Sequence, residues 1–135
     1  MFDNFFKRYK YANTRQFLRI QAPWPLKYQL STEADNPRVT LAKDVSAGGL
    51  GVVVQERIPV GSQIQVEIHV PPLSRTLSAE GQVVRTGAQG DSFELGVRFV
   101  QMNPEDRQAL DEAIEKFYSP KERARQQGTR WRRLP

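Results

Sequence analysis

Alternation of apolar and polar residues runs through most of this chain and predicts a protein built mainly from β-strands. The clearest case is 63–70, where Ile64, Val66, Ile68 and Val70 alternate with polar residues. A period of two is typical of a strand with one buried face. The same pattern, or a short apolar run, predicts further strands at 26–30, 39–43, 50–54, 76–85 and 93–99.

Turn-forming residues separate these segments at regular intervals. Polar, Gly or Pro residues cluster at 33–37, 47–49, 58–62, 71–72 and 87–91. Short strands divided by such turns indicate an antiparallel barrel or sandwich. Pro23 and Pro25 restrict the approach to the first strand to an extended or edge conformation.

Two helices are expected, one near each end of the chain. Residues 2–11 carry four aromatic residues at helical spacing. Near the other end, Asn103 suits an N-cap, Pro104 the first helical position, and Asp106 the acidic position of a capping box. The second helix should run to about Tyr118, with an apolar stripe that covers one open side of the sheet. Its stripe consists of Leu110, Ala113, Ile114 and Phe117.

Charge is distributed unevenly along the 135 residues, whose formal net charge is +5. Both ends are basic and the middle is acidic, which suggests that an anionic ligand or partner meets the termini. We therefore divide the chain into an N-terminal basic and aromatic arm (1–13), a folded domain (14–118) and a basic tail (119–135) expected to be disordered. The alternative is that both arms are solvated and contact no ligand or partner.

Two short motifs stand out against this background. Arg15 and Arg19 form an Arg-x-x-x-Arg motif, and Asp44, Ser46 and Gly49 form an Asp-x-Ser-x-x-Gly motif. Shuffling this composition gives the first motif about once but the second only ~0.03–0.04 times. Each motif alone also fits surface arginines or an ordinary turn, so it is their order, spacing and strand context that favour a binding site.

Together the motifs resemble the signature of the PilZ domain family, and the resemblance extends from about Thr14 to Tyr118. The family implies a six-stranded antiparallel β-barrel with a C-terminal α-helix, and a short N-terminal helix or arm. It also implies a receptor for cyclic diguanylate (c-di-GMP). Such receptors act on an effector protein in motility, biofilm or polysaccharide control, and the sequence does not identify that partner.

The residues suit this ligand, which carries two phosphates and two guanines. Guanidinium groups bind phosphate bidentately and also address the guanine O6 and N7 atoms. By resemblance, Arg15 and Arg19 contact phosphate and guanine, while Asp44, Ser46 and Gly49 form the guanine pocket. Glycines in the turn tolerate positive φ and leave room for the ligand.

Several further residues are candidates for the same site. Arg8, Thr14 and Gly48 belong to it if the arm folds over the ligand and the turn contacts it. Arg85 and Arg98 lie on predicted strands and could line the same face, although structural salt bridges are the expected role of both.

Other classes of function find little support in the sequence. The single histidine, His69, falls on a polar strand face, and no nucleophile motif, metal-ligand cluster or cofactor motif appears, so we expect no enzyme. The absence of cysteine, of a signal peptide and of a membrane-spanning stretch predicts a cytoplasmic protein.

Two alternatives remain open. One is a nucleic-acid-binding barrel that uses the basic arms; it is disfavoured because no aromatic residue lies between Gln29 and Ser92 to stack bases. The other is a protein adaptor that does not respond to nucleotide.

Overall fold

A closed barrel of antiparallel strands forms the body of the protein. The computed structural model describes residues 17–33 and 35–117. Strands β2, β3, β4, β5, β6 and β7 form a ring in which β3 pairs with β2 on one side and with β4 on the other. A further short strand, β1, pairs only with β3. The bounds are β1 Arg19–Gln21, β2 Pro25–Leu30, β3 Arg38–Ser46, β4 Gly49–Val54, β5 Gln63–Val70, β6 Arg75–Gln89 and β7 Ser92–Met102.

The barrel interior is filled as the alternation predicts. On β5 all four apolar residues are buried, whereas the polar residues between them, His69 included, are exposed. Trp24, Leu50, Val83 and Leu95 extend this core around the ring. The predicted six-stranded barrel with a C-terminal helix is therefore confirmed.

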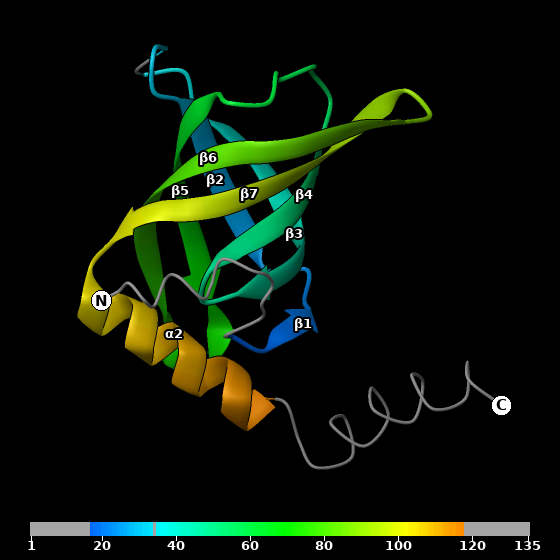
Figure 1. Ribbon diagram of the computed structural model, residues 1–135. Helices are drawn as coiled ribbons and strands as arrows, with labels where there is room; N and C mark the ends of the chain where they lie inside the picture. The colour runs from blue at the N-terminus through cyan, green and yellow to red at the C-terminus, as the bar shows by residue number, and fades with distance from the viewer. Residues whose placement is uncertain (1–16, 34, 118–135) are drawn as a thin grey trace, which may run out of the picture.

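Helix α2 (Pro104–Phe117) lies across one end of the barrel, at the bottom of Figure 1. It begins as expected, because the Oδ1 atom of Asn103 accepts hydrogen bonds from the amides of Glu105 (2.8 Å) and Asp106 (3.2 Å). Leu110 and Ile114 on its inner face are fully buried. A short 3-10 turn, η2 (Pro71–Leu73), contacts the helix after β5 ends.

Several predicted boundaries were wrong. Strand β1 was not predicted, since three residues cannot show a period, and β3 continues to Ser46 beyond a bulge near Ala42. The β6–β7 hairpin is longer than predicted, because the turn narrows to Gly90 and Asp91, with Gly90 at φ 60°. The predicted N-terminal helix and C-terminal tail lie outside the described residues.

Candidate functional site

Strand pairing brings the two motifs together on the outer face of the barrel. Arg19 on β1 lies opposite Ser46 on β3, and Ser46 lies opposite Gly49 on β4. Ile20 and Val45 face the core, so their neighbours Arg19, Asp44 and Ser46 lie on the opposite face of the strands, where Ser46 is nevertheless buried by its surroundings. Residues 25 positions apart in sequence thus form one small surface at the end of β3.

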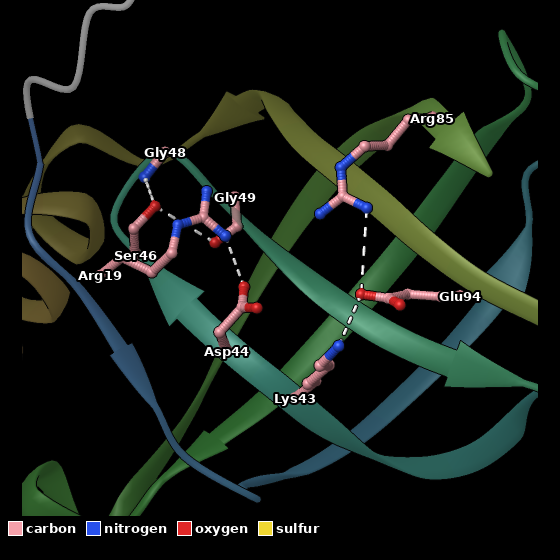
Figure 2. A network of polar contacts seen from close by, with 8 residues as sticks. All are labelled: Arg19, Lys43, Asp44, Ser46, Gly48, Gly49, Arg85 and Glu94. Carbon is pink, nitrogen blue, oxygen red and sulfur yellow. Dashed lines mark hydrogen bonds and ion pairs between the residues drawn. The ribbon is translucent and has the colours of Figure 1, made fainter. Parts of the chain in front are cut away.

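An ion pair joins the two motifs directly. The Nη1 atom of Arg19 donates to the Oδ1 atom of Asp44 at 2.5 Å, as Figure 2 shows. The Asp44 side chain is 16% exposed and that of Arg19 is 39% exposed, so the pair stays accessible from one side. The Nε atom of Arg19 is buried and, within the described residues, has no hydrogen-bond partner. A buried donor is thus left unsatisfied beside the ion pair.

The motifs did not indicate Gly51, whose lack of a side chain allows the Asp44 carboxylate to lie close to the barrel surface. Gly51 is the β4 partner of Asp44, and a Cβ atom there would lie 3.0 Å from both carboxylate oxygens. The spacing Gly49-Leu50-Gly51 was the available signal, because a period of two places both glycines on the outer face.

Ser46 shapes the turn between β3 and β4. It is the one buried polar side chain of the described residues, at 5% exposure. Its Oγ atom accepts a hydrogen bond from the Gly48 amide (3.1 Å) and donates one to the Gly49 carbonyl (3.3 Å). A Ser hydroxyl that bonds nearby backbone in this way stabilises a tight turn.

The glycines of the turn have a role in packing the backbone. Neither Gly48 nor Gly49 has a positive φ, so the turn does not use the tolerance of glycine for that conformation. At Gly49 a Cβ atom would lie 2.1 Å from the Val97 carbonyl oxygen on β7. Gly49 is therefore required because two backbones approach closely. Gly48 instead lies under the ring of Phe17, 3.2 Å from where its Cβ would be.

Helix α2 and strand β7 both hold this turn. The Nη1 atom of Arg107 on α2 donates to the Ala47 carbonyl at 3.1 Å. The Phe99 amide on β7 donates to the Gly48 carbonyl at 2.9 Å. The turn that carries the second motif is thus fixed to the helix at the end of the barrel.

Some of the remaining candidates lie outside the described residues, and the others lie on strands β6 and β7. Arg8, Thr14 and Arg15 lie outside the described residues. Arg85 reaches Glu94 only at 3.9 Å, and Arg98 donates to the Gln82 amide oxygen at 3.1 Å, with no ion pair inside the described part of the chain. The salt bridges expected of these two arginines are therefore loose or missing there.

Lys43 and Glu94 form a second ion pair near the motifs. The Nζ atom of Lys43 lies 2.8 Å from the Oε2 atom of Glu94. This hydrogen bond is the main reason that the pKa of Glu94 is lowered, and the positive charges of Lys43 and Arg85 add to it. Glu94 consequently remains a carboxylate through the neutral range.

A second surface feature does not suit an anionic ligand. A groove of about 750 Å³ lies on β2, β5 and β6 and is lined by none of the motif residues. Asp35, Glu67 and Glu80 line it, against a single cation, Lys27. Among the described residues, moreover, no cluster of His, Cys, Asp or Glu could hold a metal ion. No helix in this described part is long and apolar enough to cross a membrane.

The sequence also matches the model of a known protein family. Residues 13–116 match the model of the PilZ domain. No curated protein matches the sequence significantly.

Three solved structures share the barrel. They are the inhibitor of motility MotI/DgrA from Bacillus subtilis, at 22% identity and a TM-score of 0.68 over 78% of this chain; YcgR in complex with c-di-GMP from Escherichia coli, at 20% and 0.64 over 88%; and the PilZ domain of YcgR with c-di-GMP, at 20% and 0.57 over 87%.

This chain spans 52% and 51% of the first two structures and accounts for 98% of the third. At such identities the likeness is one of fold. The family model covers most of the sequence, both motifs stand in the expected order, and the strands bring them together. The chain therefore belongs to the PilZ domain family.

Proposed function

We propose that this protein is a receptor for c-di-GMP and has no catalytic activity of its own. The observation that carries the proposal is the juxtaposition of Arg19 with the Asp44–Gly49 turn across β1 and β3. A guanidinium and a carboxylate that lie together beside a glycine turn match a ligand with phosphates and guanine edges. Two similar structures, both of YcgR, contain c-di-GMP.

In the proposed complex, Arg19 and Asp44 address different parts of the ligand. The Arg19 guanidinium donates to a phosphate or to guanine O6 and N7, and its buried Nε becomes a further donor when the guanidinium turns toward the ligand. Asp44 accepts from guanine N–H groups. Ser46 and Gly49 keep the turn in shape beneath the base, and Gly48 offers its amide surface. Arg15, with Arg8 and Thr14, completes the site from the preceding segment.

Ligand binding has to compete with the Arg19–Asp44 ion pair. Because that pair is partly exposed, it contributes little stability, and a phosphate can replace the carboxylate at modest cost. We infer that the pair holds Arg19 close to its binding position in the free protein. This pre-arrangement lowers the cost of ordering a long side chain on binding.

The proposed signal is an ordering of the N-terminal segment that a protein partner reads. Arg19–Gln21 pair with β3 without a ligand, so we place the ordering in the residues that precede Arg19. The binding domain is 14–118, and 119–135 is a tail. The Arg107–Ala47 hydrogen bond offers a second route, through α2. The partner is not identified, and the process that it controls is motility, biofilm formation or polysaccharide synthesis. We also propose a cytoplasmic location.

Isothermal titration of c-di-GMP against the wild type and Arg19→Ala tests the proposal. Charge-assisted hydrogen bonds contribute about 1.5–3 kcal/mol each, so affinity should fall at least tenfold. Arg38→Ala is the matched control, because Arg38, on β3, is likewise a partly exposed arginine paired with a carboxylate, Glu56. Equal affinity of the wild type and Arg19→Ala would remove Arg19 from the site.

Competition separates the receptor from the nucleic-acid alternative. In a filter-binding assay with labelled c-di-GMP, unlabelled c-di-GMP should displace the label and single-stranded DNA should not. Displacement by DNA at similar concentrations would favour non-specific binding through the basic arms.

A further inference from the structure

Two paired glycines, both covered by charged side chains, extend the candidate site across two more strands. Asp44 on β3 lies opposite Gly51 on β4, Gly51 opposite Gly96 on β7, and Gly96 opposite Arg85 on β6. All four positions are on the outer face, and the two in the middle carry no side chain. Neighbouring strands lie about 4.8 Å apart, so Asp44 and Arg85 flank a floor of roughly 14 Å.

Both flanking side chains lie over this floor. A Cβ atom at Gly51 would lie 3.0 Å from the Asp44 carboxylate oxygens, and one at Gly96 would lie 2.7 Å from the Cγ and Nε atoms of Arg85. A substituent at either glycine would displace the charged group above it. The Arg19–Asp44 pair and the Arg85 guanidinium thus lie above adjacent strands, on the same face in Figure 2.

Arg85 is held there by little. Its only contact with a carboxylate in the described part of the chain is Nη1 to the Glu94 Oε2 atom at 3.9 Å, longer than a hydrogen bond. That same oxygen already accepts from Lys43 at 2.8 Å. The Arg85 side chain is 57% exposed, and an exposed pair of this length contributes almost nothing. Among the described residues, no hydrogen bond therefore occupies the exposed donors of its guanidinium.

The local charge also favours an anion. Arg19 and Asp44 neutralise each other, whereas Lys43 and Arg85 together exceed Glu94 by one positive charge. Gly51 and Gly96 carry no side chain beneath Asp44 and Arg85, so a ring can approach the backbone once these two side chains turn toward it, with a cation at the far edge. These are the requirements of a nucleotide whose phosphate reaches β6 while its base lies beside Asp44.

We propose that Arg85 is a further ligand-binding residue, which contacts a phosphate oxygen of the dinucleotide from the β6 side of the Gly51–Gly96 floor. Glu94 is its counterion in the free protein and gives it up to the ligand. This inference rests on the proposed function, because it names a new contact within the same site.

Isothermal titration of c-di-GMP against the wild type, Arg85→Ala and Arg75→Ala tests the inference. Arg75 is the matched control: it starts the same strand, its side chain is 52% exposed, and it pairs with Asp106 at 3.4 Å. It lies ten residues from Arg85, about 33 Å along β6. Arg85→Ala should weaken binding about tenfold and Arg75→Ala should leave it unchanged.

The outcomes separate the two proposals. No binding by the folded wild type would overturn the proposed function, whereas wild-type binding with Arg85→Ala within twofold of it would overturn only the role of Arg85. Arg85→Lys should retain part of the affinity, because an ammonium still pairs with phosphate. If Arg85→Lys binds as weakly as Arg85→Ala, the phosphate contact is wrong. Glu94→Gln should bind a few-fold tighter, and this gain should shrink in the double variant with Arg85→Ala.

Discussion

Replacing Gly49 with alanine should destabilise the barrel, while the same change at the adjacent Gly48 should be tolerated. At Gly49 the new Cβ would lie 2.1 Å from the Val97 carbonyl oxygen, although real Cβ contacts essentially never fall below 3.0 Å. The obstacle is the backbone of a paired strand, so no rotamer change relieves it. Strands β4 and β7 must separate locally by about 1 Å, which disturbs their hydrogen bonds.

The size of the effect follows from this overlap. Overpacking a well-ordered interior costs about 1–3 kcal/mol, and a clash with backbone belongs at the upper end. At Gly48 the Cβ would meet only the Phe17 ring at 3.2 Å, and a ring at the surface can tilt. Alanine also restricts the unfolded chain, which stabilises by about 0.4–1 kcal/mol and offsets part of either cost. We expect the two variants to differ by about 2 kcal/mol.

Urea unfolding measures this difference, with the fluorescence of buried Trp24 as a probe of the barrel. Gly49→Ala should lower the midpoint without a large change in slope, whereas Gly48→Ala should stay close to the wild type. Equal midpoints for the two variants would refute the argument that close approach of β4 and β7 requires glycine at 49. The result also matters for binding studies, because affinity lost in Gly49→Ala would then partly reflect unfolding.

Three further predictions concern the surroundings of the site. Lys43→Ala should raise the pKa of Glu94 toward its ordinary value, and a carboxyl NMR titration measures this shift. Because the pKa of Glu94 is lower in the folded state, the pair stabilises the protein at neutral pH, and this stabilisation should disappear as the pH falls through the acidic range. An unchanged Glu94 titration in Lys43→Ala would contradict this. Asn103→Ala should cost about 1 kcal/mol in urea unfolding through loss of the α2 cap, and no loss would argue against the cap. Ile114→Ala should lower the free energy of unfolding by about 2–5 kcal/mol, because Ile114 is fully buried. Val39 is 77% exposed, so Val39→Ala should change it by less than about 0.5 kcal/mol. Similar losses in the two variants would contradict the assigned core.

The barrel could be predicted from sequence because burial of one strand face produces a clear alternation of apolar and polar residues. The alternation of Ile64, Val66, Ile68 and Val70 specifies one inner face, and a shift of one residue would expose all four. Strand ends leave weaker traces. The long β6–β7 hairpin and the three-residue β1 depend on cross-strand hydrogen bonds, which bulk hydrophobicity does not encode.

The candidate site was only partly predictable. The motifs indicated Arg19, Asp44, Ser46 and Gly49, but the sequence could not show that Arg19 pairs with Asp44 or that Ser46 bonds its own turn. The glycine floor was missed, because Gly51 and Gly96 become neighbours only through strand register. Arg85 was expected to form a salt bridge, yet its carboxylate partner lies at 3.9 Å and is shared with Lys43.

Chemical-shift mapping with c-di-GMP locates the ligand without a mutation. The amides of Ser46, Gly48 and Gly49 and the Nε–H of Arg19 should shift on titration. Amides of Gln65 and Glu67, in the acidic groove on the other strands, should stay in place. Shifts confined to that groove, or no shifts at saturating dinucleotide, would contradict the proposed binding site.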